Sequence, residues 1–173
     1  MGEVRVREAV ADADRAACFA IREDVFVAEL GVPEDLEYDA YDNDASLVVH
    51  VLAVDSDGTP LGTGRLLYGP GAATKTGGEP GLGSLDRLAV TRHVRGLGVG
   101  AALVRGIEEA ARLRGLTTVG LHAQTHALGF YERLGYVAYG PEFEEAGLPH
   151  QSMRRGLGSG GAEAVGVGGG GAA

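Results

Sequence analysis

The fold is decided by the stretch Arg95-Gly96-Leu97-Gly98-Val99-Gly100, which separates a short apolar segment, 85–90, from a helical pattern that runs from Ala101 to about Arg114. This order is typical of a strand, a glycine turn and a helix. Glycines leave room for a ligand to approach the backbone, and the helix start adds free N–H groups and a positive dipole end. The stretch therefore predicts a site for an anionic, diphosphate-bearing ligand.

Apolar spacing on both sides of the glycine turn predicts a mixed α/β domain, with a strand meander in its first half and one strand-turn-helix unit at its centre. The expected strands are residues 4–9, 47–54, 60–68, 85–90, 117–123, 135–139 and 151–154. The expected helices run from Asp12 to about Leu30, from Ala101 to Arg114 and from His126 to Leu134. Asp57-Gly58 indicates a hairpin turn, and the Gly-, Pro- and Thr-rich segment 69–83 indicates a loop.

The composition changes abruptly after Arg155. Residues 1–155 have the length and apolar content of one globular domain. Residues 156–173 consist mainly of Gly and Ala with a little Val. Such a segment cannot bury enough surface to offset the entropy lost on ordering, so we expect a disordered tail.

Charge and cysteine content exclude several classes of protein. The net charge of −9 argues against a nucleic acid partner, because phosphate binding needs a surplus of Lys and Arg. The single cysteine, Cys18, rules out an internal disulfide framework and fits a reducing compartment. Residues 1–7 contain no signal-peptide core, Val6 stands where a myristoylation signal needs Ser or Thr, and no apolar run is long enough to cross a bilayer. We expect a cytoplasmic protein with no membrane partner.

Three segments occur in an order that resembles the GNAT family of N-acetyltransferases. They are Leu88-Ala89-Val90, then Arg95-Gly96-Leu97-Gly98-Val99-Gly100, then Phe130-Tyr131-Glu132-Arg133-Leu134-Gly135-Tyr136. The glycine turn is similar to the R-x-x-G-x-G acyl-CoA signature of that family. Arg22-x-x-Val25-Phe26-Val27-x-Glu29 and Gly147-Leu148-Pro149-His150 are similar to its small bacterial ElaA-type members.

The resemblance implies a single mixed, mostly antiparallel sheet with helices on both faces and a central strand-turn-helix acyl-CoA site. The donor would be acetyl-CoA, with its pyrophosphate on the glycine-turn amides and its pantetheine arm along the strand before the turn. The strand that begins near Thr117 would diverge and leave a V-shaped cleft. The expected acyl-CoA contacts are Leu88, Ala89, Val90, Arg95, Gly96, Leu97, Gly98, Val99, Gly100, Ala101, Gln124 and Phe130.

The resemblance also implies direct transfer of the acetyl group to a primary amine, with Tyr131 as the general acid that protonates the departing thiolate. A phenol suits this role because it stays protonated near neutral pH. The general base stays open among four side chains and a chain of waters. The four are Glu29, Asp86, His122 and His150.

The acceptor is expected at an acidic segment that follows the first helix. Many carboxylates lie between Glu29 and Asp44, and an acidic rim would attract a cationic amine, either a small molecule or a protein amine. The expected acceptor contacts are Arg22, Glu29 and Glu37. His122 and His126 lack the spacing and partners of a metal site, so no metal is expected. The oligomeric state, a homodimer included, stays open.

Two alternatives remain at this stage. Arg22-x-x-Val25-Phe26, Leu30-Gly31 and Gly64-Arg65-Leu66-Leu67 also resemble acyl-homoserine-lactone synthases, although Val32 stands where those enzymes favour Trp. A non-catalytic acyl-CoA sensor would use the same glycine turn without turnover.

Overall fold

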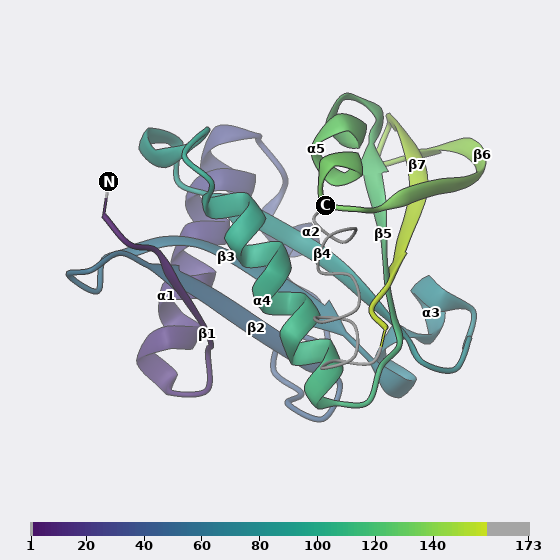
Figure 1. The fold of residues 1–173 in the computed structure, drawn as a ribbon. Coiled ribbons are helices and arrows are strands. Elements are labelled where there is room, and N and C mark those ends of the chain that lie inside the picture. The colour runs from purple at the N-terminus through teal and green to yellow at the C-terminus, as the bar shows by residue number, and fades with distance from the viewer. Residues whose placement is uncertain (1, 159–173) are drawn as a thin grey trace.

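The computed structural model describes residues 2–158, which form one seven-stranded sheet (Figure 1). The strands are β1 (Arg5–Glu8), β2 (Val48–Val54), β3 (Pro60–Leu67), β4 (Leu82–Val90), β5 (Thr118–Gln124), β6 (Val137–Glu145) and β7 (Leu148–Gly156). Their order in the sheet is β1-β2-β3-β4-β5-β7-β6. Only β4 and β5 pair in parallel within this part of the chain, which confirms the mixed, mostly antiparallel sheet.

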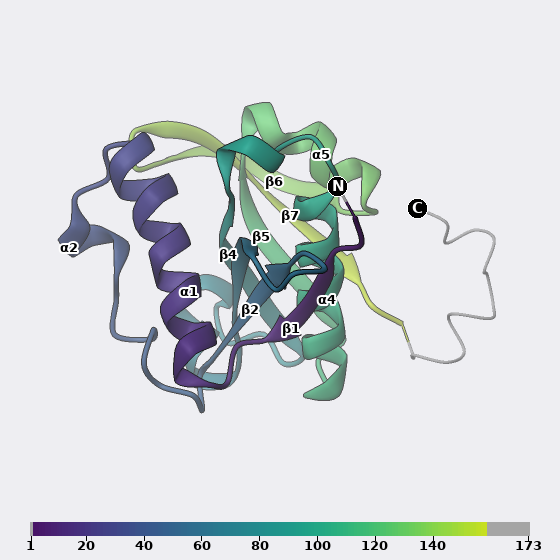
Figure 2. The same ribbon diagram turned by 90° about the vertical axis from the view of Figure 1, so that its left-hand side faces the viewer.

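Helices cover both faces of the sheet. They are α1 (Asp12–Arg22), η1 (Glu23–Glu29), α2 (Glu34–Glu37), η2 (Gly69–Ala72), α3 (Ala73–Thr76), η3 (Arg92–Val94), α4 (Val99–Leu113), η4 (Thr125–Ala127) and α5 (Leu128–Arg133). Figure 2 shows α1 and α4 on opposite sides of the strands. Leu103 and Ile107 of α4 belong to the larger apolar core, whereas Cys18 and Ile21 of α1 belong to a second one.

Most predicted elements have somewhat different bounds; the strands expected at 135–139 and 151–154, for example, are the longer β6 and β7. The helix expected from Asp12 to about Leu30 is an α-helix that continues as the π-helical η1, a difference in hydrogen bonding that apolar spacing does not resolve. The expected loop 69–83 contains η2, α3 and the first residues of β4. Helix α4 begins at Val99, because Gly98 adopts a left-handed conformation with φ +91° and ends the preceding turn.

Strands β4 and β5 pair only where they begin. The register joins Leu82 to Thr118, Gly83 to Val119 and Ser84 to Gly120, although β4 continues to Val90 and β5 to Gln124. Figure 1 shows the two strands running in clearly different directions.

A β-bulge lies in β4 where the two strands have separated. Thr63 of β3 pairs with Ala89, but Arg65 pairs with Asp86, so β4 contains one extra residue. Within this bulge Arg87 has φ +53°, a left-handed conformation that is rare for a side chain other than glycine. The bulge re-aims β4 at the position where its edge towards β5 becomes free.

The folded domain extends two residues beyond the predicted boundary at 155. Gly156 still pairs with Thr118, and the Leu157 N–H donates to the Thr117 carbonyl at 2.8 Å. The Leu157 side chain is fully buried in the larger core. The expectation that the tail begins at 156 is therefore corrected to a later start. The predicted disorder of residues 159–173 lies outside the described residues.

Leu157→Ala tests this boundary. Removing a fully buried leucine side chain leaves a cavity, so we expect the free energy of unfolding to fall by about 2–5 kcal/mol. The measurement is urea unfolding of the full chain. Leu113→Ala, at a position that is 71% exposed, is the matched control and should change stability by less than about 0.5 kcal/mol. Equal stability of the two variants would contradict the packing of Leu157.

Candidate active site

A cleft of about 490 Å³ opens where β4 and β5 diverge. One wall is formed by residues 84–88 of β4, and the other by residues 121–124 of β5. The ends of the cleft are formed by η1 and α2, by α5, and by the turn between β6 and β7. The structure thus brings together side chains from both halves of the sequence.

The glycine turn lies between the end of β4 and the start of α4. Gly96 and Gly98 have φ of +82° and +91°, and a Cβ atom at either position would meet nothing within 4 Å, so the backbone there is open. The first hydrogen bond of α4 runs from the Ala102 N–H to the Gly98 carbonyl, at 3.1 Å. The N–H groups of residues 99–101 therefore have no partner within the helix. Such a turn can bind a phosphate oxygen.

Phe130 packs against the start of α4. A Cβ atom at Gly100 would lie 3.3 Å from the Phe130 ring, so only glycine allows this approach without a shift. The Phe130 ring in turn makes an edge contact with the Tyr131 ring, at 4.9 Å between centroids. The glycine turn and the closing segment of the motif are therefore neighbours, although some thirty residues separate them in the chain.

Glu29 lies beside the glycine turn and does not line the cleft. Its carboxylate accepts a hydrogen bond from Arg95 Nη2 at 2.8 Å, and this bond lowers the pKa of Glu29. Arg95 Nε also donates to the Val90 carbonyl, at 2.9 Å. Glu29 thus orients Arg95, and the structure does not support it as a general base or an acceptor contact.

Tyr131 projects from α5 into the cleft and is only 9% exposed. Burial raises its pKa to about 12, since the apolar surroundings disfavour the phenolate. The phenol therefore keeps its proton throughout the neutral range. Such a group has a proton available for a leaving atom in the cleft.

Asp86 lines the cleft, but its carboxylate is already engaged. One Oδ atom accepts from Arg65 Nε and the other from Arg65 Nη2, each at 2.8 Å. Lys75 Nζ lies 3.9 Å from the same carboxylate. A substrate proton would have to compete with a bidentate guanidinium, so Asp86 is a poor general base.

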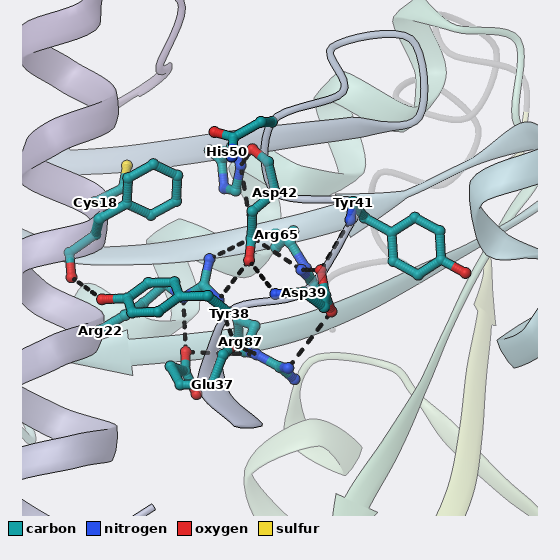
Figure 3. Close-up of polar contacts among 12 residues, drawn as sticks. Cys18, Arg22, Glu37, Tyr38, Asp39, Tyr41, Asp42, His50, Arg65 and Arg87 are labelled. Atoms are coloured by element: carbon teal, nitrogen blue, oxygen red, sulfur yellow. Dashed lines mark hydrogen bonds and ion pairs between the residues drawn. The ribbon is translucent and has the colours of Figure 1, made fainter. Parts of the chain in front are cut away.

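Arg22 belongs to a cluster of ion-paired side chains next to the cleft (Figure 3). The members of this charged cluster are Arg22, Glu37, Asp39, Asp42, Arg65 and Arg87. Its Nε donates to Glu37 and its Nη1 to Asp42, both at 2.7 Å. Arg22 is 1% exposed and does not line the cleft, so the prediction that it contacts the acceptor is corrected. Its guanidinium instead holds Glu37, which is 4% exposed and does reach the cleft lining.

Asp42 is the centre of this cluster. It accepts hydrogen bonds from Arg22, from Arg65 Nη1 at 2.9 Å and from the Asp39 N–H at 2.9 Å. Burial alone would raise the pKa of Asp42, but these hydrogen bonds and the two arginine charges outweigh it and lower the pKa to about 2. The cluster is charged at neutral pH and joins α1, α2 and the sheet.

Two histidines and one glutamate form the opposite side of the cleft. His122 Nδ1 lies 2.9 Å from Glu145 Oε1, and His150 Nε2 lies 4.0 Å from Glu145 Oε2. Sequence reasoning missed Glu145. The available sequence signal was Gly147, a turn residue two positions after Glu145. All three side chains line the cleft.

Of the remaining predicted acyl-CoA contacts, Leu88 and Gln124 line the cleft, whereas Ala89 and Val90 do not. Leu88 and Gln124 lie on its two walls, and Gln124 Oε1 lies 2.9 Å from His126 Nε2. Ala89 is 3% exposed, so its backbone rather than its side chain is available to a ligand. Beyond Ser84, β4 makes no pair with β5 anywhere in residues 2–158.

The described residues, 2–158, hold neither a cluster of metal ligands nor a helix suited to a bilayer. No group of three or more His, Cys, Asp or Glu side chains is placed to hold a metal ion there. None of the helices in residues 2–158 combines the length and the apolar character needed to span a bilayer.

Comparison with known proteins shows the family. Residues 36–157 match the acetyltransferase (GNAT) domain. YjcF of Bacillus subtilis, named an uncharacterized N-acetyltransferase, is 35% identical over 138 residues, which cover 79% of this chain and 89% of YjcF. The crystal structure of Escherichia coli ElaA has a TM-score of 0.72 and 25% identity, over 90% of this chain and 99% of ElaA. BjaI, a CoA-dependent acyl-homoserine lactone synthase, has a TM-score of 0.71 over 91% of this chain and 84% of BjaI; at 19% identity it shows the fold alone.

The chain belongs to the GNAT acetyltransferase family. Its donor substrate is accordingly an acyl-CoA, and its activity is acyl transfer. The family assignment agrees with the resemblance found in the sequence, the ElaA-type similarity included.

Asp42→Asn tests the buried cluster. The variant leaves two buried arginines without their shared anion, so we expect a loss of about 3–5 kcal/mol of unfolding free energy at pH 7. Because the pKa of Asp42 is lowered to about 2, its contribution is fully present above about pH 4 and is lost as the pH falls towards 2.

The measurement is urea unfolding at pH 7 and at steps down to pH 3. The difference between wild type and Asp42→Asn should shrink at the acidic end. Asp57→Asn, in the exposed hairpin turn, is the control and should follow the wild type at every pH. A constant difference across the range would contradict the lowered pKa.

Proposed function

We propose that the protein transfers an acetyl group from acetyl-CoA directly to a primary amine, with Tyr131 as general acid. The observation that carries this proposal is a set of three features that together define a path for the donor: the open glycine turn after β4, the edge of β4 that has no β5 partner beyond Ser84, and the buried phenol of Tyr131 in the cleft. Each part of the path suits one part of a thioester donor.

The donor would lie along this path with its pyrophosphate at the glycine turn and its thioester near Tyr131. Its pyrophosphate would accept hydrogen bonds from the turn amides at 96–101, aided by the dipole of the fifteen-residue helix α4. Its pantetheine amides would pair with the backbone of residues 88–90, whose edge beyond Ser84 is not paired with β5. Phe130 would pack against the arm, and Gln124 would donate to it from the other wall.

The chemical step would need no protein nucleophile. The amine nitrogen attacks the thioester carbonyl, the new C–N bond forms and the C–S bond breaks. Tyr131 gives its proton to the departing sulfur, and the nitrogen loses one proton to a base. Cys18 lies on the buried face of α1 and does not line the cleft, and burial raises its thiol pKa, which supports this direct route over an acyl-enzyme.

The acceptor would be a cation before it reacts. Three carboxylates line the cleft, but Glu37 is paired with Arg22 and Asp86 with Arg65. The third, Glu145, has a side chain that is 42% exposed, and its charge supports an ammonium over an anionic acceptor. Both a small amine and a lysine side chain of a protein meet this requirement, and a homodimer is compatible with either.

The fold likeness to BjaI supports a second candidate function, that of an acyl-homoserine-lactone synthase. Such an enzyme would consume S-adenosylmethionine. Incubation with acetyl-CoA or an acyl-acyl carrier protein and S-adenosylmethionine, followed by mass spectrometry for an acyl-homoserine lactone, separates the two reactions. A non-catalytic acyl-CoA sensor would bind acetyl-CoA and give no product in either assay.

Gly98→Val tests the donor site. A branched side chain at φ +91° would both strain the turn and cover its amides. We expect acetyl-CoA to raise the melting temperature of the wild type but not of Gly98→Val. Gly115→Val, at φ +76° beyond the other end of α4, is the matched control for backbone strain and should keep the response. An undiminished response in folded Gly98→Val would refute this donor site.

Tyr131→Phe tests the general acid. The assay measures release of free CoA thiol from acetyl-CoA with a panel of amines: benzylamine, putrescine, L-lysine and a lysine-containing peptide. Loss of the hydroxyl alone should lower kcat about ten- to a thousandfold while leaving the acetyl-CoA thermal shift intact. Tyr139→Phe, 41% exposed and outside the cleft lining, should keep the wild-type rate. A wild-type rate in Tyr131→Phe would exclude the proposed role.

A further inference from the structure

We infer that His122 is the general base that accepts the proton of the amine, and that Glu145 positions His122 for this role. The inference rests on the acetyl transfer proposed above. It selects one of the four side chains that the sequence left open, and it adds a residue that the sequence did not suggest.

Geometry removes two of the four. Glu29 is ion-paired with Arg95 beside the glycine turn and does not line the cleft. Asp86 does line it, but both of its oxygens accept hydrogen bonds from Arg65. The two histidines remain, and they lie on the same side of the cleft, on β5 and β7.

The contact with Glu145 fixes the tautomer of His122. An ionised carboxylate can only accept hydrogen bonds, so at 2.9 Å from Glu145 Oε1 the Nδ1 atom of His122 must carry the hydrogen. Neutral His122 then has its lone pair on Nε2. The Phe143 ring packs edge-on against the imidazole, at 5.0 Å between centroids, and limits its rotation.

Exposure distinguishes His122 from His150. The His150 Nδ1–H donates to the Leu148 carbonyl at 2.8 Å, so His150 also has its lone pair on Nε2, which lies 4.0 Å from Glu145 Oε2. Its side chain is 9% exposed, however, whereas that of His122 is 29% exposed. An acceptor in the cleft can therefore reach His122 more readily than His150.

A bound ammonium first loses one proton to solvent and becomes the neutral amine that can attack, and the transfer step then balances. As the amine nitrogen bonds to the carbonyl carbon, its proton moves to His122 Nε2, and the resulting imidazolium faces the Glu145 carboxylate through Nδ1–H. Tyr131 protonates the sulfur. Afterwards His122 releases one proton to solvent and Tyr131 takes one back, so the products are the amide and free CoA. This carboxylate–histidine pair is the arrangement that stabilises an imidazolium formed during a reaction.

The role of Glu145 in positioning His122 is tested by ¹⁵N NMR of the full chain, labelled at histidine, near neutral pH. The wild type should show His122 as the Nδ1–H tautomer. Glu145→Ala should give a mixture of both tautomers, and Glu145→Asp should restore part of the preference. An Nε2–H tautomer in the wild type, or no change in Glu145→Ala, would overturn the positioning role.

The role of His122 as general base is tested with the amine of the panel above that the wild type acetylates fastest. His122→Ala should lower kcat about 10²- to 10⁴-fold without loss of the acetyl-CoA thermal shift, and added imidazole should restore much of the rate. His122→Gln, of similar size, should be equally slow and is the second variant if the alanine form fails to fold. His93→Gln, at an exposed position outside the cleft lining, should keep the wild-type rate.

The outcomes separate the two proposals. A wild-type rate in folded His122→Ala or His122→Gln, or a slow His122→Ala that imidazole does not rescue, overturns the role of His122 while leaving acetyl transfer in place. Absence of transfer by the wild type to every amine overturns the proposed function, and the inference with it.

Discussion

The site depends on one constraint, the separation of β4 from β5. The two strands pair over residues 82–84 and 118–120, and then each continues without the other. Continued pairing would satisfy the backbone of β4 and close the sheet. Separation instead leaves an unpaired strand edge and a cleft beside it, which together suit an extended, amide-bearing donor that ends in a reactive group.

The buried charges explain how this separation is maintained. The bulge at Arg87 holds a non-glycine residue at φ +53°, a conformation that costs on the order of 1–3 kcal/mol and needs support from its surroundings. Arg87 Nε donates to the Glu37 carbonyl at 3.2 Å, and Arg65 binds Asp86 next to it. Asp42 links two of the three arginines of the cluster, Arg22 and Arg65, so α1, α2 and the bulged strand are fixed as one unit (Figure 3).

The same cluster changes the meaning of the acidic segment. Taken as sequence, the residues between Glu29 and Asp44 resemble an acidic rim that attracts a cation. In the structure Asp42 and Glu37 are buried and neutralised by arginines, and Glu29 holds Arg95. The carboxylate with the most exposed side chain in the cleft lining is Glu145, from the other end of the chain. Charge composition alone cannot distinguish a buried ion pair from a solvated one, because the partner is remote in sequence.

The sequence by itself determined the sheet class, the strand-turn-helix unit at 85–114 and the family, because each depends on local signals: apolar period, glycine placement and a motif of fixed spacing. It also indicated Tyr131 and the open turn at Gly98. Only the tertiary structure decided the burial of Leu157, the engagement of Asp86 and the pairing of His122 with Glu145. Those depend on contacts between segments far apart in the chain, and on a register that places one side chain rather than its neighbour in the cleft.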